Sequence, residues 1–183
     1  MAVMEPDAAS GGVTDVRAAD PRELYSACYD RLVRVLTLVA GDRAEAEDVV
    51  QEAFVRLVPR WSKISTYDDP EAWVRAVAFR ILSNRFRRAR NALAAARRSD
   101  DVRRTRDADE VAETSGDGVD IARALALLPV GQRQVVVLHH LLDQSVDEIA
   151  VTLGVPVGTV KSRLSRARVA LAPLLREESP DHV

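Results

Sequence analysis

The sequence predicts an all-α fold made of two small helical domains joined by a flexible linker. Long runs are rich in Ala, Leu, Arg and Glu, which lose little rotamer freedom in a helix, whereas aromatic residues make up only 4% of the chain. Apolar residues recur at helical spacing in two parts of the chain, and the part between them has no such pattern. A chain of 183 residues is long enough to bury two small cores.

The composition also excludes several classes of protein. The single cysteine, Cys28, rules out an internal disulfide and a cysteine-based zinc site, and we interpret it as a small buried apolar residue. The longest apolar run, Val35–Ala40, is much too short to span a bilayer, and residues 1–20 lack the features of a signal peptide. We therefore expect a cytoplasmic protein with no membrane insertion.

The net charge of −2 hides an uneven distribution of charge. Residues 75–106 contain eleven Arg and only two acids, and residues 156–176 contain four Arg, one Lys and no acid. The acids gather in residues 42–52 and 107–120. We therefore expect the basic and the acidic surfaces to meet different partners.

The first domain is expected to follow a disordered tail of residues 1–19, which has no periodicity. Asp20 suits the N-cap of a helix over residues 21–40, because proline fits its first position. Gly41 interrupts the chain, and a second helix then runs to about Pro59. The buried side of the first helix is expected to contain Leu24, Cys28, Leu32, Val35 and Val39.

Residues 61–69 are expected to form a loop, since they have no sustained period and many turn-forming residues. Pro70 starts a third helix, whose basic far end reaches Arg90. This helix completes the first domain, which we assign to residues 20–90. Its buried stripe is expected to contain Trp73, Val77 and Ile81.

Residues 91–120 have no apolar face and are rich in Ala, Arg, Asp and Ser, so we expect a flexible linker there. The second domain follows over residues 121–176, and a tail occupies residues 177–183. Turn-forming residues divide this domain into four short helices. They are expected over residues 121–128, 132–142, 146–153 and 157–175.

The sharpest local pattern lies in the last two of these helices, which meet at Gly154. This glycine can adopt the positive φ that a sharp turn requires, and Ala150 is small where the second helix must cross closely. The pattern predicts a helix-turn-helix. Its inward-facing side chains are expected to be Ile149, Leu153, Val160 and Leu164.

The second helix of this motif carries a polar face without acids, opposite its packed side. Basic side chains there suit guanine edges and hydroxyls suit bases or phosphates, so we expect this helix to read the major groove. The alternative is an ordinary helical hairpin with a solvated basic face. Arg163 lies nearer the packed boundary and is expected to touch phosphates or acidic neighbours. The residues expected to face DNA are Thr159, Lys161, Ser162, Ser165 and Arg166.

Two stretches carry a family resemblance. The first comprises Leu128-Pro129, Gln132-Arg133, Glu148-Ile-Ala150, Leu153-Gly154-Val, Gly158-Thr-Val-Lys-Ser-Arg-Leu164 and Arg166-Ala-Arg168. It resembles region four of extracytoplasmic-function sigma factors of bacterial RNA polymerase. The second, Ala46-Glu-Asp-Val-Val-Gln-Glu-Ala-Phe54, resembles the region-two helix that docks on the polymerase clamp. The match covers about residues 21–90 and 121–172, and it implies a non-enzymatic factor, without a cofactor, that directs transcription initiation.

The resemblance also implies partners. Asp48, Gln51 and Glu52, with Phe54 beside them, match the polymerase-binding surface of region two; without the resemblance they would be interpreted as a solvated acidic helix face. The implied partners are core RNA polymerase, through its clamp and flap, and promoter DNA. A cognate anti-sigma factor that masks these surfaces is implied as well.

The remaining implied contacts concern the minus-ten promoter element. The loop takes the place where relatives capture a flipped base, and Tyr67 either stacks on that base or packs on the core. Relatives often have Asn where this chain has Arg80, so the DNA specificity of this helix is not carried over. The implied loop residues are Ser65, Thr66, Tyr67 and Asp68. The implied residues of the following helix are Arg80, Asn84, Arg85, Arg87 and Arg88, whose cations suit DNA phosphates.

Two other classes of function compete with this interpretation. A stand-alone helix-turn-helix regulator accounts for the second domain but leaves the acidic helix and the aromatic loop of the first domain without a role. A metal-dependent enzyme requires a site such as His139, His140 and Asp143. Adjacent histidines point about 100° apart on a helix and chelate poorly, so no metal site is expected.

Overall fold

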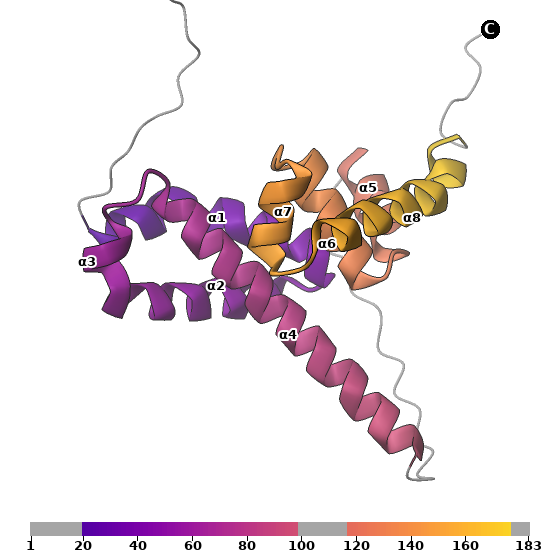
Figure 1. Cartoon of the computed structure of the whole chain (residues 1–183), viewed down its shortest axis with the longest axis horizontal. Helices are drawn as coiled ribbons and strands as arrows, with labels where there is room; N and C mark the ends of the chain where they lie inside the picture. The colour runs from indigo at the N-terminus through magenta and orange to yellow at the C-terminus, as the bar shows by residue number, and fades with distance from the viewer. Residues whose placement is uncertain (1–19, 99–116, 177–183) are drawn as a thin grey trace, which may run out of the picture.

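The computed structural model describes residues 20–98 and 117–176, and this part of the chain contains helices and no strand (Figure 1). The all-α prediction is therefore confirmed for these residues. The expected tails, residues 1–19 and 177–183, lie outside the described residues, as does most of the expected linker, residues 99–116.

Two antiparallel helices begin the fold, with the caps that the sequence predicts. Helix α1 spans Pro21–Ala40 and α2 spans Arg43–Leu57. The carboxylates of Asp20 and Asp42 each accept a hydrogen bond of 2.8 Å from a backbone N–H of the first turn. Gly41 has a φ of 80°, and its N–H closes the end of α1.

The segment after α2 differs from the expected loop. A 3₁₀ turn, η1 (Val58–Arg60), leads into one turn of α-helix, α3 (Trp61–Ile64). Only residues 65–69 are irregular, and Thr66 and Tyr67 donate backbone hydrogen bonds to α3 carbonyls. The helical turn forms because Ile64 is buried among the core helices, a tertiary contact that turn-forming neighbours do not reveal.

Helix α4 spans Pro70–Arg98, eight residues beyond the predicted end at Arg90. Its buried stripe also differs: Ile81 is buried as expected, whereas Trp73 and Val77 are only partly buried. Trp73 and Val77 line a cleft between α4 and α7, whereas other side chains of α4 pack against α1, α2, α6 and α7. The buried residues of α4 are Val74, Ala78, Phe79, Ile81 and Leu82.

The second domain contains the four helices that its sequence predicts, with shifted ends. They are α5 (Asp117–Ala126), α6 (Val130–His140), α7 (Val146–Leu153) and α8 (Val157–Arg176). Helix α5 thus begins inside the stretch expected to be linker. Ser145 and Glu148 form a reciprocal capping box at the start of α7, and Gly154 ends it at a φ of 65°.

The two domains pack against each other, which the sequence did not predict. Helices α1 and α4 of the first domain contact α5, α6 and α7 of the second (Figure 1). The buried apolar side chains of both domains form one continuous cluster. This docking decides how much of each domain's surface is open to partners.

Candidate nucleic-acid interface

Helices α7 and α8 form the predicted helix-turn-helix. Ile149 and Val160 are fully buried, and Leu153 and Leu164 are 8% and 5% exposed. The left-handed backbone of Gly154 makes the sharp turn between the helices, as the sequence predicts. The motif therefore holds the outward face of α8 rigidly against a packed core.

The outward face of α8 presents the predicted polar side chains to solvent. Lys161, Ser165 and Arg166 are exposed, and Ser162 is exposed with its hydroxyl donating 3.0 Å to the carbonyl of Thr159. Thr159 is half-buried near the start of the helix. A cationic and hydroxylic face of this kind, without acids, suits base edges and phosphates in a major groove.

Arg163 faces another way. Its guanidinium packs beside Gly131 of α6, where a Cβ atom would lie 3.2 Å from Cζ. Burial, and to a lesser extent the charge of Arg90, hold its pKa below the ordinary value. Arg163 is therefore directed into the boundary between the domains, where the described lining contains other arginines and no acid.

A basic groove lies at this boundary. It has a volume of about 930 Å³ and runs between α4, α6 and the turn after α7. No Asp or Glu is among the described residues that line it. Five arginines line the groove: Arg80, Arg87, Arg90, Arg133 and Arg163. The charges of both basic stretches of the sequence thus meet on one surface.

The acidic face of α2 is only partly as expected. Asp48 and Gln51 are exposed, whereas Glu52 is half-buried and accepts hydrogen bonds from Arg85, at 2.8 Å, and from Arg56. Phe54 is 7% exposed and packs edge-on against Tyr25, so it is a core residue and not part of the open surface. Phe54 is therefore not available in this structure for the direct contact with polymerase that the resemblance implies.

Sequence reasoning missed the apolar part of the same face. Val55 and Val58 are 70% and 61% exposed. The spacing from Asp48 and Gln51 to Val55 follows one side of a helix. A valine at a solvent-facing helical position is the sequence signal that could have revealed this apolar part of the face.

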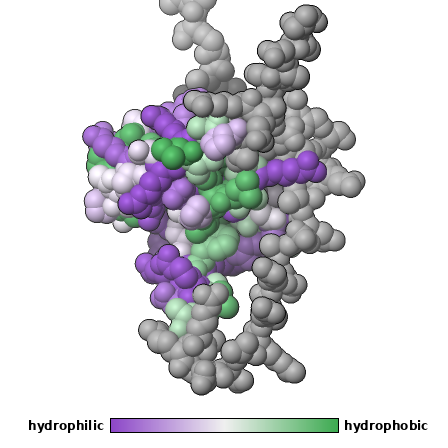
Figure 2. Space-filling model, turned by 90° about the vertical axis from the view of Figure 1, so that its right-hand side faces the viewer, coloured by the Kyte–Doolittle hydropathy of each residue, from purple (hydrophilic) through white to green (hydrophobic). Residues whose placement is uncertain are grey.

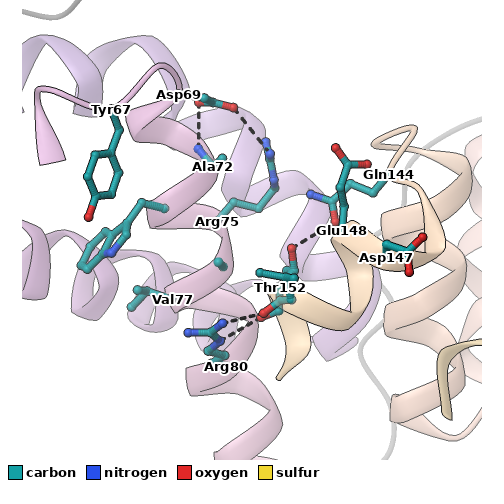
Figure 3. A pocket seen from close by; sticks show the side chains of 13 residues that line it. Tyr67, Asp69, Ala72, Arg75, Val77, Arg80, Gln144, Asp147, Glu148 and Thr152 are labelled. Atoms are coloured by element: carbon teal, nitrogen blue, oxygen red, sulfur yellow. Dashed lines mark hydrogen bonds and ion pairs between the residues drawn. The ribbon is translucent and has the colours of Figure 1, made fainter. Parts of the chain in front are cut away.

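A cleft of about 670 Å³ separates the start of α4 from α7. Figure 3 shows Tyr67 on one side of it and Gln144, Glu148 and Thr152 on the other. Tyr67 is 38% exposed, so it is not a core residue, and Asp68 is exposed beside it. Of the other loop residues, Ser65 is half-buried, and the exposed Thr66 donates its hydroxyl to the Lys63 carbonyl at 2.8 Å.

The basic residues of α4 separate into two groups. Asn84, Arg87 and Arg88 are exposed, as a DNA-facing role requires. Arg80 instead donates to the carbonyls of Thr152 and Val151 in α7, at 2.9 and 2.5 Å. Arg85 pairs with Glu45 at 3.0 Å and with Glu52. In this structure the guanidinium groups of Arg80 and Arg85 are therefore committed to protein contacts.

Comparison with known proteins identifies the family. The family described as "Sigma-70 region 2" matches residues 24–92, and "Sigma-70, region 4" matches residues 119–171. The "ECF RNA polymerase sigma factor SigL" of Mycobacterium tuberculosis is 34% identical over 172 residues, which cover 91% of this chain and 94% of the relative. The chain belongs to the extracytoplasmic-function family of RNA polymerase sigma factors. It therefore directs transcription initiation, and it is not an enzyme.

Two further similarities agree with this assignment. The sigma factor SigC of Mycobacterium tuberculosis is 31% identical over 146 residues, covering 77% of this chain and 74% of the relative. The sigma factor RpoE of Bartonella quintana, in its complex with the anti-sigma factor NepR, superposes with a TM-score of 0.63 at 26% identity, covering 86% of this chain and 98% of that one.

The pairing of Arg85 with the acidic helix of this sigma factor predicts a pH-dependent stability. The hydrogen bond from Arg85, supported by Arg56, holds the pKa of Glu52 below its ordinary value of 4.5. A depressed carboxylate pKa stabilises the folded state above that value, and the stabilisation is lost as pH falls through the depressed pKa. We expect Arg85→Met to lower the free energy of unfolding near neutral pH, with a difference from wild type that shrinks below about pH 4.5.

Urea unfolding at a series of pH values measures this difference. Arg88→Met is the matched control, because Arg88 is an exposed arginine of the same helix. Its effect should be small and independent of pH. A constant difference for Arg85→Met across the acidic range would show that the pair with Glu52 contributes nothing.

The described part of this sigma factor holds no group of three or more His, Cys, Asp or Glu that could bind a metal ion. The rings of His139 and His140 meet edge to face at 4.7 Å, and Nδ1 of His139 lies 2.8 Å from the carbonyl of Gln144. Asp143 turns the chain with a φ of 48°. Among the described residues, no helix is long and apolar enough to cross a membrane.

Proposed function

We propose that this sigma factor acts in the cytoplasm by holding core polymerase on α2 and reading two promoter elements with its two domains. The observation that carries the proposal is the exposed, acid-free face of α8 on a rigid helix-turn-helix. Lys161, Ser162, Ser165 and Arg166 contact base edges and phosphates of the minus-thirty-five element, with Thr159 near the helix start.

The minus-ten element is bound by the first domain. Tyr67 lines the cleft and can stack on an unpaired base, and Ser65, Thr66 and Asp68 flank it in the same loop. Asn84, Arg87 and Arg88 extend the contact along α4 to the phosphates. Promoter melting then uses binding energy, because the loop holds bases that have left the stack.

Polymerase is bound by both domains. Asp48 and Gln51 supply exposed polar contacts to the clamp on α2, with the apolar Val55 and Val58 beside them. On the second domain, apolar patches lie between polar side chains on the face turned toward the viewer in Figure 2. The exposed apolar residues of α5, the turn after it and α8 are Ile121, Leu127 and Val169, and we assign them to the flap.

A cognate anti-sigma factor is the third proposed partner. Two solved structures that resemble this chain are complexes: the sigma factor RpoE is bound to the anti-sigma factor NepR, and CnrH is bound to the cytosolic domain of CnrY. The basic groove between the domains is also lined by the apolar Phe86, Leu93 and Val155, so it suits an acidic amphipathic segment of such a partner.

In vitro transcription tests the proposal. Genomic promoter fragments are incubated with bacterial core polymerase, with and without the sigma factor, and duplex binding by the sigma factor alone is measured in parallel. We expect promoter-specific transcripts only when both proteins are present, and weak duplex binding by the sigma factor alone. Tight duplex binding without transcripts would instead support a stand-alone regulator.

A further inference from the structure

A network of ion pairs joins α2 to α4 inside the first domain. Arg85 of α4 pairs with Glu45 at 3.0 Å and with Glu52 at 2.8 Å, and Arg56 of α2 pairs with the other carboxylate oxygen of Glu52. Glu45, Glu52 and Arg56 follow one another at intervals of seven and four residues, so they share one side of α2, the side that meets Arg85. Two cations balance two carboxylates, so the network has no net charge.

This network lies beside the surface that is proposed to bind DNA phosphates. Arg88 follows Arg85 by three residues on α4, and residues with this spacing are neighbours on a helix, with Cβ atoms about 5–6 Å apart. Arg88 is exposed, whereas the side chain of Arg85 is 33% exposed. Charges interact in solution over about 10 Å at 0.1 M salt. Phosphates held by Arg88 are therefore within range of the charges of Glu45 and Glu52.

Arg85 gains little by leaving its carboxylates for a phosphate. Its guanidinium makes charge-assisted hydrogen bonds to both Glu45 and Glu52, and such bonds are the strong ones in proteins. Transfer to a phosphate would replace anionic oxygens by other anionic oxygens. It would also leave Glu45 without its arginine at a short distance from the DNA, where like charges repel. The paired state of Arg85 is therefore the favourable one with DNA bound.

We propose that Arg85 supports promoter binding without touching DNA: it neutralises Glu45 and Glu52, so that these carboxylates of α2 do not repel the phosphates held along α4. The inference rests on the proposed function. Glu47 of α2 is likewise paired, with Arg43 at 2.8 Å. In the part of the chain that the structure describes, Asp48 is then the acid of α2 whose charge has no arginine partner, and it lies on the face proposed for the clamp.

Rearrangement of the charges separates this role from a direct phosphate contact. Arg85→Met leaves two carboxylates with one cation. The double variant Arg85→Met, Glu45→Gln is neutral again, because Glu52 keeps its pair with Arg56. If Arg85 acts through the carboxylates, the single variant weakens promoter binding and the double variant recovers it. A direct contact of Arg85 with a phosphate would instead be lost equally in both variants.

Promoter affinity is measured with holoenzyme, formed from core polymerase and saturating sigma factor, on a fragment that the wild type transcribes. We expect roughly fivefold weaker binding for Arg85→Met at about 0.1 M salt, and binding within about twofold of wild type for the double variant. Arg43→Met is the matched control, because it removes the arginine partner of Glu47, whose charge acts on Tyr25 of α1. Its promoter affinity should equal that of wild type.

Arg56→Gln tests the same idea without a change in α4. Arg56 is exposed, so its replacement should leave the fold intact, yet the network then has the same net charge as in Arg85→Met. We expect promoter binding to weaken in this variant as well. Titration of the Glu52 carboxyl group by nuclear magnetic resonance checks the network without polymerase or DNA. Because the hydrogen bond from Arg85 lowers the pKa of Glu52, that pKa should rise in Arg85→Met.

Circular dichroism establishes that each variant remains folded, and Arg56→Gln decides the question if Arg85→Met unfolds. Equal losses for Arg85→Met and the double variant would overturn the proposal in favour of a direct phosphate contact. Unchanged promoter binding by Arg85→Met and Arg56→Gln would overturn it as well, since the carboxylates would then have no influence on DNA. Wild-type holoenzyme that transcribes no fragment would overturn the proposed function and, with it, this role of Arg85.

Discussion

The variant Asp48→Arg is expected to lose promoter-specific transcription while keeping its fold. Asp48 is an exposed carboxylate on the face of α2 proposed to bind the clamp. Within residues 20–98 and 117–176 it forms no ion pair, unlike Glu52, which pairs with Arg56 and Arg85. Reversal of its charge places like charges together at the interface, which costs on the order of 3 kcal/mol. That cost corresponds to roughly a hundredfold loss of affinity for core polymerase.

Transcription assays and direct measurement of polymerase binding check this expectation. Asp30→Arg is the matched control, because it makes the same charge reversal at an exposed position of α1, outside the proposed surface. Transcription by the control should stay within about threefold of wild type, since surface substitutions away from a contact change little. Equal losses for both variants would assign the effect to net charge and not to the α2 face.

The variant Phe79→Ala is expected to lower the free energy of unfolding by about 3–5 kcal/mol, because removal of a fully buried phenyl ring leaves a cavity. Phe79 is 0% exposed and is among the largest fully buried side chains of the described core. It lies on α4, which contacts helices of both domains. The buried apolar side chains of the two domains form one cluster, so both should be destabilised.

Urea unfolding followed by far-ultraviolet circular dichroism measures this loss. Leu127→Ala serves as the control, because that leucine is 69% exposed and its truncation should change the free energy by less than about 0.5 kcal/mol. A loss below about 1 kcal/mol for Phe79→Ala would mean that the core around α4 collapses readily onto the smaller side chain.

Local patterns predicted the helices and their caps well. The Asp20 and Asp42 caps and the turn at Gly154 are where the sequence places them, because capping depends on a few neighbouring residues. Helix α4 continues to Arg98 and α5 begins at Asp117, so both helices extend into the stretch expected to be linker. Neither end has an apolar stripe, so periodicity had no signal to detect there.

Some residues of the candidate interface were predicted correctly from the sequence, and others were not. The outward face of α8 could be predicted from the helical period alone, and most of its predicted side chains are exposed as expected. Phe54 and Arg85 were placed on open surfaces, whereas the structure buries Phe54 beneath Tyr25 and pairs Arg85 with Glu45 and Glu52. Both outcomes depend on partners from other helices, and the sequence does not indicate which helix those partners come from.

The sequence by itself determined the all-α class, the helix-turn-helix and the family to which this sigma factor belongs, because each depends on periodicity, turn residues and long motifs. Only the tertiary structure decided that the domains dock, that Arg80 caps α7 and that the arginines of both domains meet in one groove. These features arise from contacts between residues some 70 positions apart, as with Arg80 and Thr152 at a separation of 72. Such contacts are determined by how whole helix faces pack together, and no local sequence pattern encodes that packing.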